Sequence, residues 1–132
     1  MEVSDEVTEL RDAVARLVMG WSATRMPWAY EGVASVWHDG DGVPLMACAA
    51  WRPEDDAAQR ARVLDAMVRR GFGFEIAGDG AQTRVAFSRD GQTMAVALDA
   101  DRARALLRAA LATVEADRET GDRAPVVDGP AT

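Results

Sequence analysis

A chain of 132 residues, of which 48% are hydrophobic and 28% charged, has the size and composition of one globular domain. Its 22 acidic residues outnumber its 15 basic ones, and the resulting formal net charge of -7 disfavours binding to nucleic acid polymers or to anionic lipid. One cysteine and one histidine exclude an intrachain disulfide and the usual zinc ligand sets. The acidic N-terminus is unlike a secretory signal and no apolar run reaches membrane-spanning length, so we expect a cytoplasmic protein without membrane contact.

The N-terminal segment is predicted to form an amphipathic helix over about residues 5–19, with Ser4 as its N-cap and Gly20 at its end. Its apolar residues recur at helical spacing. They are Val7, Leu10, Val14, Leu17 and Val18. The following passage, 21–32, contains Pro27, and a proline there argues against a central strand, so we expect it to be irregular.

A hairpin and a second helix are expected next. Two short apolar segments, 33–38 and 45–51, flank the turn sequence DGDG at 39–42, which predicts a β-hairpin. Pro53 is interpreted as the first residue of the helix, because that position needs no backbone N–H, and the acidic run that follows it suits the positive end of the helix dipole. Gly71 is expected to end this helix.

The C-terminal half is predicted to be a three-stranded meander followed by a third helix. Three segments alternate apolar and polar residues, at 72–76, 83–87 and 94–98. Asp99 is expected to cap the last helix, whose apolar face ends at Val114. We therefore predict one α+β domain over 1–117 and a disordered tail over 118–132. The domain is expected to be an antiparallel sheet of about five strands covered by three helices, in the order α-β-β-α-β-β-β-α.

Four passages resemble the phage ABA-sandwich domain family, a group of small phage and prophage proteins. They are LRDAVARLVMGW, DDAAQRARVLDAMVRRGFGFEI, TRVAFSRDGQTMAVAL and DRARALLRAALATV, and together they extend from Leu10 to Val114. The resemblance implies helices packed on a sheet and a phage accessory role in the cytoplasm of a bacterial host. It implies no catalytic residues.

The residue types that most often act in catalysis are better explained here by structural roles. His38 lies beside Asp39, but no nucleophile motif accompanies it, so we interpret it as a surface or rim residue. Cys48 lies in an alanine-rich segment and reads as a small buried residue of a strand. The acidic pairs at 39/41 and 55/56 are typical of turns and helix starts. We therefore expect no enzyme activity, no metal and no cofactor.

Aromatic residues are concentrated in the first 51 positions, although only 6% of the chain is aromatic. This group consists of Trp21, Trp28, Tyr30, Trp37 and Trp51. Tryptophan is highly buried on average, so we expect Trp21 and Trp37 to pack the first helix against the sheet. Trp28 and Tyr30 flank Pro27 and are better suited to recognition or to an oligomer interface.

The candidate ligand-binding residues are Arg25, Trp28, Tyr30 and Arg52. Aromatic rings can stack on a nucleobase, and arginine forks can hold its phosphates. Phages encode small proteins that sequester the nucleotide signals of bacterial immunity, and by analogy we expect a noncatalytic protein that captures a nucleotide-like signal. The alternative is a protein-interaction or phage structural accessory module with no small ligand, in which Trp28 and Tyr30 form a homo-oligomer or partner interface. We expect the chain to associate into at least a dimer.

Overall fold

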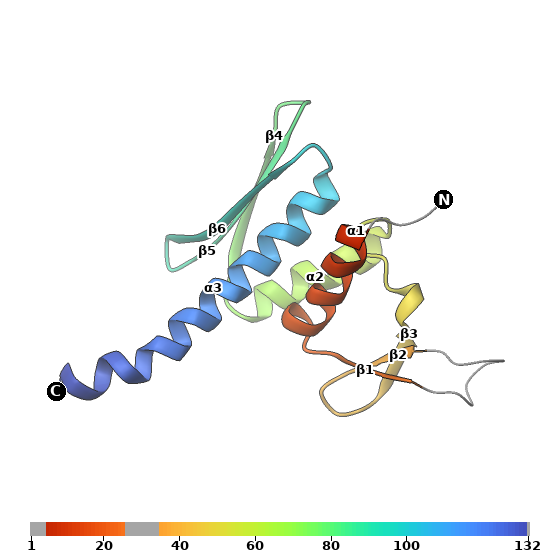
Figure 1. The fold of residues 1–132 in the computed structure, drawn as a ribbon. Coiled ribbons are helices and arrows are strands. Elements are labelled where there is room, and N and C mark those ends of the chain that lie inside the picture. Colours follow the sequence, from red (N-terminus) through yellow and green to blue (C-terminus); the bar gives the residue numbers. More distant parts are fainter. Residues whose placement is uncertain (1–4, 26–34, 132) are drawn as a thin grey trace.

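The computed structural model describes residues 5–25 and 35–131, and the side chains of residues 6–25 and 35–119. Within these ranges the chain forms three α-helices and two antiparallel three-stranded sheets (Figure 1). The predicted α+β class is confirmed, but the single sheet of about five strands is wrong, because the strands divide into two separate sheets. None of the described helices is long and apolar enough to cross a membrane.

The predicted first helix is present, but its second part is π-helical and not α-helical. It consists of α1 (Asp5–Ala13) and a continuing π-helical segment, η1 (Val14–Val18). The backbone N–H of Met19 donates to the carbonyl oxygen of Val14 at 3.0 Å, five residues back. Gly20 follows with a φ of 76°, as expected for the end of a helix. The proposed cap, Ser4, lies outside the described residues.

The smaller sheet has the order β1-β2-β3, with strands β1 (Ser22–Arg25), β2 (Ser35–His38) and β3 (Pro44–Ala47). Strand β1 corrects the prediction of an irregular passage. It is an edge strand that ends before Pro27, so the proline removes none of its ladder hydrogen bonds to β2.

The predicted hairpin is formed by β2 and β3, and the side chain of Asp39 accepts the N–H groups of Asp41 and Val43 in the turn. The second strand is shorter than expected. It gives way to a 3₁₀ turn, η2 (Cys48–Ala50), so Cys48 lies in this turn and not in a strand.

Helix α2 (Ala57–Arg69) begins later than predicted. Asp56 is the N-cap, because its carboxylate accepts the N–H of Gln59 at 3.0 Å, and Pro53 lies in the preceding turn. The predicted end is confirmed: Gly71 has a φ of 95°, and Phe72 N–H reaches back to the Met67 carbonyl at 3.1 Å.

The predicted meander forms the larger sheet, of order β4-β5-β6, with strands β4 (Gly73–Gly78), β5 (Thr83–Arg89) and β6 (Gln92–Asp99). Helix α3 (Arg102–Ala131) packs against β5 and β6. Its first turn is capped by Asp101, which accepts the N–H of Arg104 at 3.2 Å, so the predicted cap at Asp99 is wrong by two residues. Helix α3 is assigned beyond Asp117, and the division into a domain of 1–117 and a tail stays a prediction.

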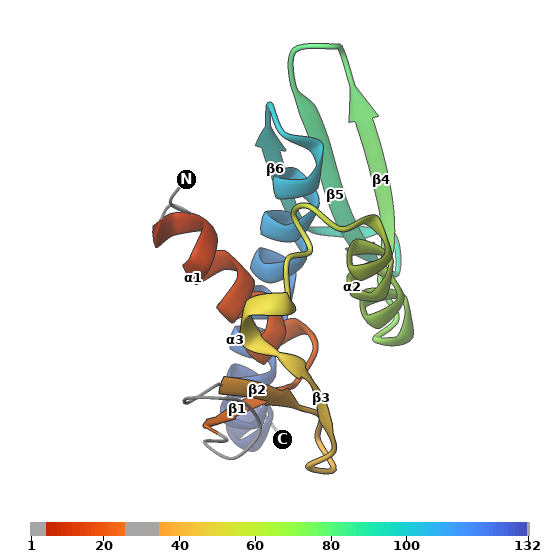
Figure 2. The ribbon, with the colours of Figure 1, turned by 90° about the vertical axis from the view of Figure 1, so that its right-hand side faces the viewer.

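The core lies where α3 passes between the larger sheet and the α1–η1 helix, with α2 beside it (Figure 2). Its fully buried side chains come from all of these elements. They include Val14, Trp51, Met67, Phe87 and Leu107. Trp21 and Trp37 are buried as expected, with 7% and 3% of their surface exposed.

Candidate ligand-binding site

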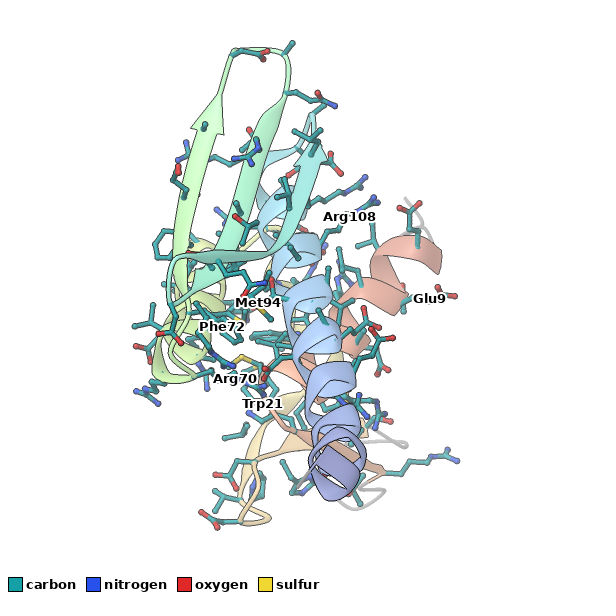
Figure 3. The ribbon with its side chains drawn as sticks, turned by 90° about the vertical axis from the view of Figure 1, so that its left-hand side faces the viewer. Glu9, Trp21, Arg70, Phe72, Met94 and Arg108 are labelled. Atoms are coloured by element: carbon teal, nitrogen blue, oxygen red, sulfur yellow. The ribbon has the colours of Figure 1, made fainter. Side chains whose placement is uncertain are left out.

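A hollow of about 560 Å3 lies between the end of η1 and one side of α2. This volume is in the range of small-molecule sites in proteins. The residues that line the hollow are Val18, Met19, Trp21, Arg62, Asp65, Ala66, Arg69 and Arg70. Figure 3 shows two of them, Trp21 and Arg70, close together beside α3.

Helix α2 supplies the charged side of the hollow. Arg62, Asp65 and Arg69 are three or four residues apart, so they share one face of the helix. Arg69 and Asp65 form an ion pair of 2.9 Å. Arg62 has no ion pair with a described residue, and its guanidinium carbon lies 5.2 Å from the centre of the Trp21 ring. Within the described residues, Arg62 is therefore held by a cation–π contact with an aromatic ring and not by an ion pair with a carboxylate.

Arg70 joins the two sides of the hollow. Its Nη2 donates to the carbonyl oxygens of Leu17 at 3.0 Å and Val18 at 2.8 Å, at the end of η1. The carbonyl oxygen of Arg70 in turn accepts from Nη2 of Arg89 at 3.0 Å. These contacts fix the distance between η1 and α2, and so the width of the hollow.

Behind the hollow, Trp21, Trp37 and Trp51 pack together, and this group is here called the tryptophan wall. The Trp21 ring meets Trp51 edge to face, with their centroids 4.7 Å apart, and lies 6.4 Å from the centroid of Trp37. Trp51 is only 1% exposed, and its Nε1 donates to the carbonyl oxygen of Arg11 at 3.1 Å. Because Trp21 is itself nearly buried, it supports Arg62 from below and offers a ligand little of its own surface.

A part-buried ion pair holds this wall to the turn before α2. Nε of Arg11 donates to Oε2 of Glu54 at 2.6 Å, and the two side chains are 16% and 8% exposed. This hydrogen bond, with the Glu54 charge, raises the pKa of Arg11 against the opposing effect of burial. Arg11 therefore keeps its charge, and its contact with Glu54 is part of the scaffold behind the hollow.

The hollow is electropositive although the protein is acidic. Three guanidinium groups and one carboxylate line it, whereas the whole chain has a formal net charge of -7. Concave surfaces lined by one sign of charge concentrate the opposite ion. The arrangement therefore suits an anion, and the planar guanidinium of Arg62 offers a surface on which a ring can stack.

Of the four predicted site residues, the structure describes Arg25 and Arg52, and neither of these two lines the hollow. Arg25 is exposed at the end of β1, and Arg52 is exposed and pairs with Asp55 at 3.2 Å. Trp28 and Tyr30 lie outside the described residues. The register places Arg25 opposite Ser35, at the end of the smaller sheet from which β3 leads toward Arg52. Arg52 itself lies beyond the η2 turn, where its backbone N–H donates to Oε1 of Gln59 on α2 at 2.6 Å.

Two other sequence candidates have structural roles. Nδ1 of His38 is hydrogen-bonded to the carbonyl oxygen of Val36, at 3.1 Å. Burial raises the pKa of the Cys48 thiol, which lowers its reactivity as a nucleophile. Within the described part of the chain, no group of three or more His, Cys, Asp or Glu residues is placed to hold a metal ion.

Comparisons with protein families, with curated proteins and with solved structures find no match to this chain. The similarity to the phage ABA-sandwich family stays a prediction.

Proposed function

We propose that this protein is a noncatalytic binding protein that captures a small, nucleotide-like anion in the hollow between η1 and α2. The observation that carries the proposal is Arg62, a guanidinium without an ion pair to a described residue, stacked over Trp21 at the wall of an electropositive hollow. A nucleotide presents both a phosphate for arginine forks and a base for a planar guanidinium.

The geometry favours capture over turnover. Arg70 and the packed tryptophans hold the two sides of the hollow in place, and preorganisation of this kind increases affinity. The ionisable side chains that line the hollow are three arginines, which do not act as general bases, and Asp65, whose carboxylate is engaged in an ion pair with Arg69.

The biological role that we propose is the sequestration of a nucleotide signal of bacterial immunity by a phage-encoded protein. This role is supported by the resemblance of residues 10–114 to small phage proteins, together with the anion-binding character of the hollow. A protein of this kind needs to bind one class of signal tightly and does not need to catalyse a reaction.

The proposal is tested by calorimetric titration with cyclic dinucleotides and ADP-ribose-type nucleotides. We expect wild type to bind a member of this panel and Arg62→Ala to lose about 1–3 kcal/mol of binding free energy, or roughly ten- to a hundredfold in Kd. Arg52→Ala is the matched control, because Arg52 is an equally charged residue outside the hollow. Melting curves of each variant separate lost affinity from lost structure.

Each result has a definite meaning. Weaker binding by Arg62→Ala alone supports the hollow, and weaker binding by Arg52→Ala alone supports the residues predicted from sequence. If wild type binds nothing in the panel, and the protein releases no small molecule on denaturation after expression in a host with an active nucleotide-signalling defence, capture is wrong. The interaction-module alternative then replaces it.

A further inference from the structure

The larger sheet is covered on one face only. Helix α3 packs on the face that contains Val85 and Phe87, both fully buried, and Figures 1 and 2 show α3 on that side of β4, β5 and β6. Alternate residues of the strands point to the other side, here called the open face. The open face consists of Glu75, Ala77, Arg84, Ala86, Val96 and Leu98, of which Ala86, on the central strand, is only 9% exposed. Val96 is 42% exposed and Leu98 is 56% exposed, so apolar side chains lie there without a covering layer in the described chain.

The strand register arranges the open face in two rows. The first row runs Glu75, Ala86, Val96 and the second runs Ala77, Arg84, Leu98. Each row therefore has one charged, one small and one branched apolar residue. Neither Glu75 nor Arg84 forms an ion pair with another described residue, and the two charges have opposite signs on neighbouring strands.

We propose that a second copy of this chain docks on the open face, related by a two-fold axis that runs between the two rows and perpendicular to the strands. Such an axis places each residue of one row over the other row of the partner. Val96 then lies over Leu98 of the partner subunit, and Glu75 lies beside Arg84 of the partner subunit. Packed sheets are about 10 Å apart, a distance that a glutamate and an arginine can bridge together.

The pattern favours a second copy over an unrelated protein because the face is complementary to itself. The two-fold operation exchanges the row with the carboxylate and the row with the guanidinium, so two ion pairs form at once. Strands about 4.8 Å apart and a spacing of about 7 Å between alternate residues give the six residues a face of about 200 Å2 per copy, against roughly 800 Å2 for a standard stable interface. The association is therefore weak and depends on concentration.

The experiment is sedimentation equilibrium of the full chain without ligand over a concentration series. We expect wild type to associate at high concentration, and both Glu75→Arg and Arg84→Glu to weaken this association about tenfold or more, because each single variant places like charges opposite each other. An equimolar mixture of the two single variants should associate again, since each charge then meets its opposite. Val96→Asp should also prevent association.

Val68→Asp is the matched control, because Val68 is a similarly exposed valine, 51% exposed, on α2 and outside the open face. It should associate like wild type, and melting curves should show that all variants are folded. A wild type that stays monomeric at the highest concentration overturns the proposal. So does an association that the charge variants leave unchanged, or a mixture that fails to recover it. The result does not depend on the ligand, because the hollow lies between η1 and α2 and shares no residue with the open face.

Discussion

Nη2 of Arg70 donates to the carbonyl oxygen of Val18 at 2.8 Å, and this contact joins the C-terminal ends of α2 and η1. The last carbonyl groups of a helix have no partner within it, so a side-chain donor there both satisfies them and complements the negative end of the helix dipole. Arg70 also contacts the Leu17 carbonyl at 3.0 Å. A single side chain thus stabilises the unusual π-helical ending of η1.

We expect Arg70→Ala to lower the free energy of unfolding by about 1–2 kcal/mol, because it leaves two carbonyl groups without this donor. Arg69→Ala is the control: it removes only an exposed i,i+4 ion pair with Asp65 and should cost no more than about 0.5 kcal/mol. Urea unfolding of both variants measures the difference. Equal stabilities would show that water replaces Arg70 at no cost.

Gly71→Val should destabilise the fold through its backbone. Gly71 has a φ of 95°, which side-chain-bearing residues rarely adopt, and a β-branched residue resists it further. A Cβ there would find only Nε of Arg89, at 3.9 Å, so no steric clash contributes. The expected cost is about 1 kcal/mol or more.

Gly40→Ala serves as the comparison, because Gly40 has no positive φ and open space around its Cβ position. Its unfolding free energy should stay within about 0.5 kcal/mol of wild type. If the two glycine variants have equal free energies of unfolding, the left-handed conformation at the end of α2 does not contribute to stability.

Periodicity alone was enough to predict that the three helices and the meander form. It did not identify the buried side of β6, where the alternating apolar residues Val96 and Leu98 are 42% and 56% exposed. It was not enough for helix starts. Pro53 and Asp56 are both acceptable start signals, and the choice depends on Asp56 reaching the N–H of Gln59. The division into two sheets was also not predictable, because alternation along a strand does not show which strand edges meet.

The candidate site was predictable only in part. The prediction that Trp21 and Trp37 are core residues is confirmed, and the structure adds Trp51 as their neighbour. The cationic partner of Trp21 was not predictable from neighbours in sequence. Arg62 is 41 residues from Trp21 and reaches it only because α2 packs beside η1. The regular spacing of arginines on α2 was the available signal, but it is equally typical of a solvated helix face.

Cys48 should react slowly with iodoacetamide in the folded protein. Burial, and secondly the Asp12 carboxylate, raise the pKa of its thiol, and the thiolate is the reactive form. The folded-state pKa lies above the unfolded value, so the contribution to stability is present below the unfolded pKa and is lost as pH rises through the folded pKa. The pH midpoint of the alkylation rate should therefore be higher in the native chain than in urea.

The unfolded chain is the internal reference for this measurement, and Cys48→Ser shows that labelling is specific to the thiol. A native midpoint equal to or below the unfolded one would contradict the direction of the pKa shift. It would also indicate that Cys48 is more solvated than its position in the η2 turn implies.

A chain that ends at Asp117 should melt within error of the full chain. Asp117 forms an ion pair of 2.8 Å with Arg89, and residue 117 is retained in this variant. The sequence beyond it, 118–132, has no periodic apolar face and is rich in glycine, proline and charge, a composition that contributes little to a core.

A second truncation, ending at Thr113, also removes Val114, which is 1% exposed. Losing a buried valine costs about 1.5–3 kcal/mol, so this shorter chain should melt several degrees lower. If the chain ending at Asp117 is already destabilised by that much, residues 118–132 contribute to folding and the boundary predicted at 117 is wrong.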